Sequence, residues 1–193
     1  MKRYVWMVLV LVSALVVAPR ARGQTVTGDV ANVQSLVKAG DWAAVLAACD
    51  KAYEKYGAAV VENAHPQVPV LFFYKGWSMY HTGDVDGAAA FFKARADNPD
   101  SPRRLQACFC LSKLFWLARR PAESHQYGLL FLTLWSGRGE EEARIVAFNA
   151  VKPSLLGKEA YVSLLESLIL KIPAIEENAK FLGRLKSELE KIR

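Results

Sequence analysis

The sequence predicts an all-α protein assembled from short helical hairpins. Apolar residues recur at intervals of three and four along residues 24–193, which is the spacing of an amphipathic helix. Glycine and proline fall between these segments, and no useful length of chain alternates between apolar and polar residues as a half-buried strand does. A chain of 193 residues with 52% apolar residues can bury a sizeable core, so we expect a single domain over residues 24–193.

The first 23 residues are predicted to be a secretory signal peptide. Lys2 and Arg3 form a basic start, and residues 4–18 follow as a run of 15 in which only Ser13 is clearly polar. That run has the length of a signal-peptide apolar region and is short for a membrane span of about 20 residues. The sequence therefore predicts export and an extracytoplasmic protein, either periplasmic or secreted.

Cleavage is expected after Gly23. The stretch Ala21-Arg22-Gly23 supplies the small-x-small pattern that signal peptidases recognise, which places Gln24 at the mature N-terminus. The alternative is an uncleaved membrane anchor, because Arg20 and Arg22 flank the apolar run. Contact with a membrane is expected only through this segment.

The net charge of +6 does not predict a nucleic-acid partner. Residues 1–23 hold four basic residues and no acid, so the remaining chain has 21 basic and 19 acidic side chains and a net charge of +2. A nucleic-acid-binding domain is expected to carry a much larger positive charge.

The periodicity places nine helices along the mature chain. They are expected at about residues 29–39, 42–56, 69–81, 85–96, 102–118, 121–135, 140–150, 155–170 and 174–192. Gly57 stands where a left-handed helix cap is favoured, and residues 58–68 are expected to be a linker. Pro102 suits a first helical turn, and Ser101 before it can accept a hydrogen bond from a helix N–H group. Pro153 and Pro173 separate the last helices.

Two hairpins share a finer pattern of small and aromatic residues. Residues 70–99 contain a small residue in the first helix, a Gly-Asp turn seven residues later and small or aromatic positions in the second helix: Gly76, Gly83-Asp84, Ala88, Phe92 and Asn98-Pro99. Residues 33–57 repeat this theme with Gly40-Asp41, Trp42, Val45, Cys49 and Ala52. A weaker third copy spans residues 103–131, where Ser112 takes the small position.

With these signatures, residues 28–136 resemble the tetratricopeptide repeat family. The resemblance implies a right-handed α-solenoid of about three to four stacked hairpins. Lys75 departs from the family pattern, which usually has a buried leucine there. Residues 174–193 are expected to close the solenoid as an amphipathic capping helix whose apolar face carries Ile175, Ala179, Leu182, Leu185 and Leu189.

The resemblance also implies a concave groove lined by the first helix of each hairpin. In the second copy the matching residues are Phe73, Trp77 and Tyr80, with His81 beside them, and in the third copy they are Phe109, Lys113 and Trp116. Each set is spaced i, i+4, i+7 and shares one helical face. We expect an aromatic trough with one cation, suited to an apolar or extended peptide or to sugar rings. The alternative is that these aromatics belong to the core, with Phe72, Gly76 and Met79 exposed instead.

Catalysis and metal binding are not expected. The chain has no G-x-S-x-G, H-E-x-x-H or glycine-rich phosphate loop, so we predict no catalytic residues and no cofactor. His65, His81 and His125 and the three cysteines fit no zinc spacing. The cysteines, Cys49, Cys108 and Cys110, are expected to be small buried apolar residues without a disulfide between the last two.

These observations lead to one principal functional expectation. The chain is expected to be a non-catalytic extracytoplasmic adaptor or scaffold that binds a protein or peptide within a cell-envelope or secretion assembly. The alternative is a carbohydrate or cell-wall binding module that uses the same aromatic residues for sugar stacking. An enzyme or a purely structural unit is a third possibility, and the oligomeric state is left open by the sequence.

Overall fold

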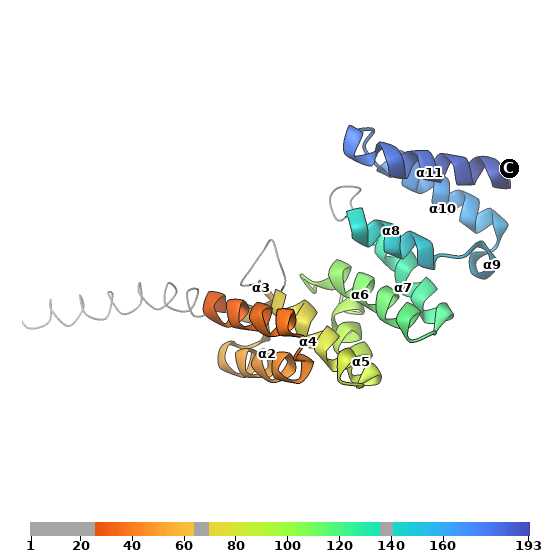
Figure 1. Ribbon diagram of the computed structural model, residues 1–193. Helices are drawn as coiled ribbons and strands as arrows, with labels where there is room; N and C mark the ends of the chain where they lie inside the picture. Colours follow the sequence, from red (N-terminus) through yellow and green to blue (C-terminus); the bar gives the residue numbers. More distant parts are fainter. Residues whose placement is uncertain (1–25, 64–69, 136–140) are drawn as a thin grey trace, which may run out of the picture. The chain divides into compact units, whose positions relative to one another are not determined.

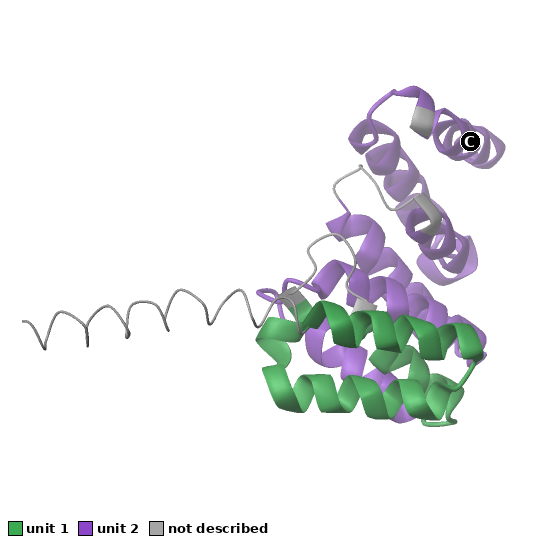
Figure 2. Cartoon of the chain, turned by 60° about the vertical axis from the view of Figure 1, so that its left-hand side comes forward, with its two compact units in different colours: residues 1–84 green, residues 85–193 purple. Residues whose placement is uncertain are grey.

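All regular structure in the part of the chain that the computed structural model describes, residues 26–63, 70–135 and 141–193, is helical (Figure 1). This confirms the predicted all-α class. The chain divides into two compact units, residues 1–84 and 85–193 (Figure 2). The predicted signal peptide lies outside the described residues. Among the helices that are described, none combines the length and the apolar character that crossing a membrane requires.

The first unit contains a helix over residues 26–39, followed by α2 (Trp42–Tyr56), α3 (Ala58–Asn63) and α4 (Val70–His81). Helices α2 and α4 pack against each other in opposite directions, since the start of α2 meets the end of α4. Buried side chains from all four helices form one core: Val26, Val30, Val33, Val45, Cys49, Ala52, Val61 and Leu71.

The second unit contains seven helices in its described residues. They are α5 (Val85–Ala96), α6 (Arg104–Leu117), α7 (Pro121–Leu134), α8 (Glu141–Ala150), α9 (Pro153–Leu156), α10 (Lys158–Lys171) and α11 (Glu176–Ile192). Helix α6 packs against α5, α7 and α8, and α10 packs against α11. Neighbours in sequence are therefore neighbours in space, as they are in any protein built from helical hairpins.

Helices α6, α7 and α8 meet at a close contact, which we call the α6–α7–α8 junction. The Ser112 hydroxyl donates to the carbonyl of Ser124 at 3.0 Å, and the Ser124 hydroxyl donates to the carbonyl of Ser112 at 2.8 Å. Both serines are fully buried. A Cβ atom added to Gly128 would lie 2.9 Å from the carbonyl oxygen of Ala147 in α8, so only glycine allows the three helices to approach this closely.

Helix α11 is joined to α8 through a buried arginine. Arg144 is 1% exposed and donates a hydrogen bond to the side-chain oxygen of Asn178 in α11. Its guanidinium lies 5.5 Å from the centre of the Trp135 ring and 5.0 Å from that of Phe181. These contacts fix the rotation of α11 about its own axis.

The rotation of α11 corrects the predicted apolar face. Leu182 and Leu185 are buried as expected, but Phe181 is also buried, while Ile175 is 50% exposed and Ala179 lies at the surface. The predicted stripe was wrong at its N-terminal end because Phe181 and Asn178 take the inward positions there, and this turns residues 175 and 179 outward.

Most helix boundaries differ from the predicted ones by a few residues, and three regions differ in a way that the local structure explains. Residues 58–63 were expected to be linker but form α3, and the helix expected over residues 155–170 is two helices separated at Gly157. Gly157 has a φ of 84°, which a helix interior does not allow. Helix α6 begins at Arg104, so Pro102 lies in the turn before it, where the Ser101 hydroxyl accepts from the Arg103 N–H at 3.2 Å.

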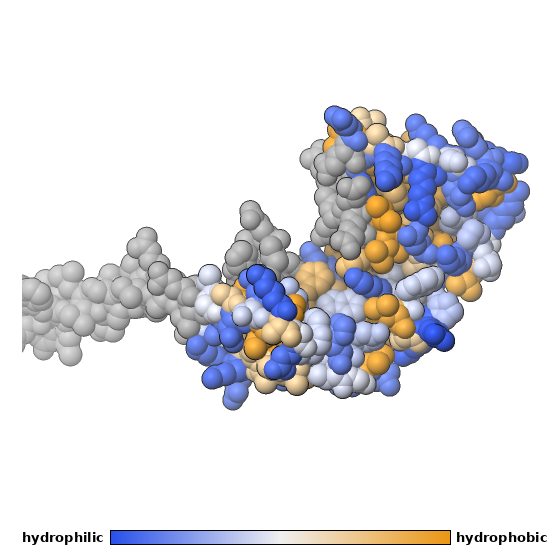
Figure 3. Space-filling view, in the orientation of Figure 1, coloured by the Kyte–Doolittle hydropathy of each residue, from blue (hydrophilic) through white to orange (hydrophobic). Residues whose placement is uncertain are grey.

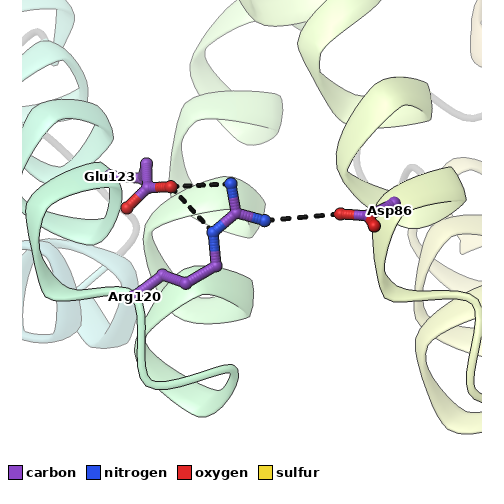
Figure 4. A network of polar contacts seen from close by, with 3 residues as sticks. All are labelled: Asp86, Arg120 and Glu123. Carbon is purple, nitrogen blue, oxygen red and sulfur yellow. Dashed lines mark hydrogen bonds and ion pairs between the residues drawn. The ribbon is translucent and has the colours of Figure 1, made fainter.

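The turn between α6 and α7 is built without glycine. Arg119 takes the left-handed backbone position there, with a φ of 57°. The guanidinium of the next residue, Arg120, contacts Glu123 of α7 at 2.6 Å and Asp86 of α5 at 3.4 Å (Figure 4). It also lies 4.5 Å from the centre of the Phe115 ring. This side chain links the ends of three helices at the surface of the second unit.

All three cysteines are free and fully buried, which confirms the prediction made for them. Burial raises the pKa of the Cys49 thiol to about 12 and that of the Cys108 thiol to about 11. Because the thiolate is the reactive form, both side chains are expected to be unreactive at neutral pH.

Candidate functional site

The structure places the seven predicted site residues in two groups. Phe73, Trp77, Tyr80 and His81 lie on α4 in the first unit, and we call them the α4 row. Phe109, Lys113 and Trp116 lie on α6 in the second unit, and we call them the α6 row. The rows belong to different units, and a trough that combines them stays a prediction.

None of the seven side chains is buried. In the α4 row the three aromatic side chains are partly exposed and His81 is exposed, whereas Phe72 and Gly76 on the other side of the helix are buried. In the α6 row Phe109 and Lys113 are partly exposed and Trp116 is 54% exposed. The alternative expected Phe72, Gly76 and Met79 to be exposed; Phe72 and Gly76 are buried, while Met79 is partly exposed like the aromatic residues of the row.

Trp77, Tyr80 and His81 of the α4 row contact one another through their rings. The rings of Trp77 and Tyr80 meet edge to face with their centres 5.8 Å apart, and Tyr80 meets His81 in the same way at 5.3 Å. His81 in turn stacks on Trp42, with centres 4.0 Å apart and planes 15° from parallel. These geometries are the favoured ones for aromatic pairs, and they hold the four rings in fixed orientations.

Trp42 was not among the predicted site residues, although the sequence shows it directly after the Gly40-Asp41 turn. That position is the signal that could have revealed it. Because α2 and α4 run in opposite directions, the first residue of α2 lies beside the last residue of α4. We use the name aromatic cluster for Trp42 together with Trp77, Tyr80 and His81.

Two glycine turns position the aromatic cluster. Gly40, with a φ of 74°, precedes α2, and the Asp41 carboxylate accepts from the Ala44 N–H at 3.0 Å as the N-cap of that helix. Gly83, with a φ of 93°, follows α4 and donates to the carbonyl of Tyr80 at 3.1 Å. Both turns need a positive φ, so glycine at these places sets the helix ends that carry Trp42 and His81.

The surroundings of Lys75 show how a lysine is accommodated between α2 and α4. Its ammonium lies 2.6 Å from a carboxylate oxygen of Asp50 and 4.6 Å from the centre of the Tyr53 ring, both on α2. Its side chain is only 16% exposed. The aliphatic part of the lysine therefore fills the space between α2 and α4, while its charged end is paired with Asp50.

The α6 row is supported differently. Phe109 lies against the buried Phe131 of α7, with ring centres 6.1 Å apart. The ammonium of Lys152 lies 5.6 Å from the centre of the Trp116 ring, within the range of a cation–π contact. Leu117, next in sequence, is 46% exposed. The end of α6 thus presents apolar surface beside a positive charge.

Lys152 is itself positioned by a buried histidine. Its backbone N–H donates to Nδ1 of His125 at 3.1 Å, so this nitrogen carries no proton in the folded chain. His125 is 9% exposed, and burial lowers its pKa from the ordinary 6.5. The neutral imidazole is therefore the form that fixes the start of α9 and, through it, the position of the Lys152 ammonium near Trp116.

The two rows offer groups that can make contacts with another molecule. Aromatic rings with fixed orientations can pack against apolar side chains, proline or sugar rings, and the nearby ammonium groups can pair with a carboxylate. Within residues 26–63, 70–135 and 141–193, no group of three or more His, Cys, Asp or Glu side chains could hold a metal ion.

Comparisons with protein-family models, with curated proteins and with solved structures returned no match to this chain. The resemblance of residues 28–136 to tetratricopeptide repeats accordingly stays a prediction.

Proposed function

We propose that this protein is a non-catalytic extracytoplasmic adaptor that binds a protein or peptide partner through the α4 and α6 rows. The observation that carries the proposal is the aromatic cluster, in which Trp42, Trp77 and Tyr80 are partly exposed, His81 is exposed, and the four rings contact one another. Rigid exposed aromatic side chains bind with a small loss of conformational entropy, which is why tyrosine and tryptophan dominate the energetics of protein interfaces.

The helix packing supports a repeat architecture for this adaptor. Helix α6 contacts both helices that follow it as well as the one before it. Stacked hairpins make such contacts, because a single hairpin cannot bury its own apolar side. The proposal therefore includes a right-handed tetratricopeptide-like solenoid of stacked hairpins.

The charges near the α6 row indicate the kind of segment that would bind. Lys113 is part of the row, and the Lys152 ammonium lies near the Trp116 ring. An extended peptide with an apolar side chain next to an acidic one could pack on the indole and pair with an ammonium group. The predicted signal peptide places this encounter outside the cytoplasm, within a cell-envelope or secretion assembly.

A carbohydrate ligand is the second candidate, because Trp116 is 54% exposed and an exposed indole is a suitable surface for a sugar ring. The position of Lys152 near this ring favours a carboxylate-bearing peptide over a neutral sugar. Retention of the protein on an insoluble polysaccharide, with release by soluble sugar, would support the second candidate instead.

The proposal is tested by copurification from the envelope fraction of the producing cell, using the protein with a C-terminal affinity tag. Trp77→Ala and Trp116→Ala are expected to reduce recovery of a specific partner protein by about tenfold or more. Leu155→Ala is the matched control, because Leu155 on α9 is 50% exposed and lies outside both rows. Thermal melts must show first that each variant folds.

Two results would contradict the adaptor reading of the rows. One is a partner that is recovered equally well with both tryptophan variants. The other is a variant Leu155→Ala that reduces partner recovery as much as the tryptophan variants do, because partner binding would then not depend on the α4 and α6 rows.

A further inference from the structure

The outward face of α11 forms an apolar hollow that the adaptor function does not use. The hollow has a volume of about 390 Å³ and is lined by Ala174, Ile175, Glu176, Ala179, Leu182, Gly183 and Lys186. Leu170 and Ile175, on either side of the break between α10 and α11, are 87% and 50% exposed. An exposed large apolar side chain in an apolar hollow, as Ile175 is here, is typical of a surface that another molecule covers.

Gly183 lies inside this hollow, in the middle of α11. A Cβ atom added to it would meet nothing within 4 Å, so packing within the chain does not require glycine at this place. Glycine destabilises a helix interior relative to alanine. The contrast is Gly128, where an added Cβ would lie 2.9 Å from the backbone of α8. A glycine that faces outward allows the backbone of a second molecule to approach α11 closely.

The residues that line the hollow are complementary to themselves. Consider a second α11 that runs antiparallel to the first, with a two-fold axis beside position 181. Ala179 then lies opposite Gly183 of the second copy, and Glu176 lies opposite Lys186 of the second copy. Both charged residues are exposed at the rim of the hollow. The two-fold symmetry produces each small-residue pair and each opposite-charge pair twice, as an isologous interface requires.

We propose that this protein forms a homodimer through antiparallel packing of α11 against α11 of a second copy, centred on position 181. Ala179 and Gly183 let the two helices approach closely, while the exposed Ala174 and Ile175 supply apolar area. Glu176 and Lys186 set the antiparallel direction and the register. The interface lies on α11 and uses no residue of the α4 or α6 row. A test of dimerisation is therefore independent of a test of partner binding.

The test is sedimentation equilibrium on the protein purified in the form that accumulates in the producing cell, over a range of concentrations. Gly183→Gln places a longer side chain in open space, so at a concentration where both proteins are monomeric the variant should melt at the wild-type temperature or above it. The dimer dissociation constant should rise by about tenfold or more, equivalent to about 1.4 kcal/mol. Ser163→Gln, at an exposed position of α10, is the matched control and should sediment as wild type.

A charge exchange provides the second test. Glu176→Lys alone and Lys186→Glu alone should each weaken the dimer, because each places like charges opposite one another across the axis. The double variant Glu176→Lys/Lys186→Glu should recover the wild-type dissociation constant to within about threefold, since opposite charges meet again.

A wild-type protein that remains monomeric at about 100 μM would overturn the proposal. A dimer that Gly183→Gln leaves intact would overturn it as well, because the contact would then lie elsewhere on the molecule. Failure of the double charge variant to recover dimerisation would contradict the antiparallel register.

Discussion

Trp135 and Trp116, both in the second unit, show how differently the protein treats the same side chain. Trp135 is fully buried with the guanidinium of Arg144 near its ring, whereas Trp116 is 54% exposed with the ammonium of Lys152 near its ring. Each tryptophan pairs with a cation from a later part of the chain. The difference arises from the neighbouring helices, because α8 and α11 converge on Trp135.

A cation near an aromatic ring can therefore serve either packing or binding. Around Trp135 the arginine also bonds Asn178, and the group joins α8 to α11. Around Trp116 the lysine is held through its backbone by His125, and the indole remains accessible. Burial, rather than residue type or helical spacing, separates the structural contact from the candidate binding surface.

The largest expected effect is on the buried side of this comparison. Trp135→Ala should lower the free energy of unfolding by about 3–5 kcal/mol, because it removes a fully buried indole and leaves a cavity. Trp116→Ala should lower it by about 1 kcal/mol or less, since only a surface cation–π contact is lost. Urea denaturation of both variants measures the difference, and equal losses would place Trp116 in the core.

The next effect extends the comparison to two helical glycines. Gly128→Ala should reduce the free energy of unfolding by about 1–3 kcal/mol, because the added Cβ would lie 2.9 Å from the Ala147 carbonyl oxygen at the α6–α7–α8 junction. Gly183→Ala should increase it by about 0.5–1 kcal/mol, since alanine favours the helix and the added Cβ meets open space. Both values come from urea titrations at a concentration where the wild type is monomeric. If both variants lowered or both raised the free energy of unfolding, the packing described for Gly183 or for Gly128, respectively, would be contradicted.

A pH titration tests how His125 supports the α6 row. Its pKa is lower in the folded chain than the ordinary 6.5, so the unfolded chain binds the proton more readily. The stabilising contribution is complete above about pH 6.5 and is lost as the pH falls from there through the lower folded pKa. His125→Asn keeps an acceptor for the Lys152 N–H but does not titrate, so the free energy of unfolding should depend less on pH below about 6.5. An unchanged dependence would show that this histidine does not control stability there.

The sequence predicted the helices well where glycine and proline mark their ends. The helices over residues 42–56 and 85–96 were predicted to the residue, because Asp41 and the Gly83-Asp84 turn precede them. Helix α3 was missed because residues 58–63 are too short a stretch to show a helical period. The face of α11 was partly wrong because Asn178, a polar residue, turns inward to bond Arg144, a contact between distant parts of the chain.

The candidate site was predictable within each helix but not across helices. Spacing alone placed the α4 and α6 rows on single faces, and the described side chains are partly or fully exposed. Trp42 was missed because its stacking on His81 depends on the antiparallel packing of α2 and α4. Lys152 was missed for the same kind of reason, since 36 residues separate it from Trp116 in the sequence.

The smallest expected effect concerns the lysine that departs from the repeat pattern. Lys75→Leu should change the free energy of unfolding by about 1 kcal/mol or less, because leucine fills the space of the aliphatic chain and the lost ion pair has a half-exposed partner in Asp50. Thermal melts of Lys75→Leu and the control Lys51→Leu, at an exposed position of α2, measure it. A loss of several kcal/mol would show that the ion pair, and not the packing, holds α2 and α4 together.

The most direct test of the proposed binding surface is tryptophan footprinting by hydroxyl radicals, read by mass spectrometry, on the free protein and on its complex with a copurified partner. Trp77 and Trp116 should be oxidised in the free protein and protected in the complex, while Trp135 should resist oxidation in both. Full oxidation of Trp77 and Trp116 in the complex would contradict the account, because the partner would then bind away from both rows.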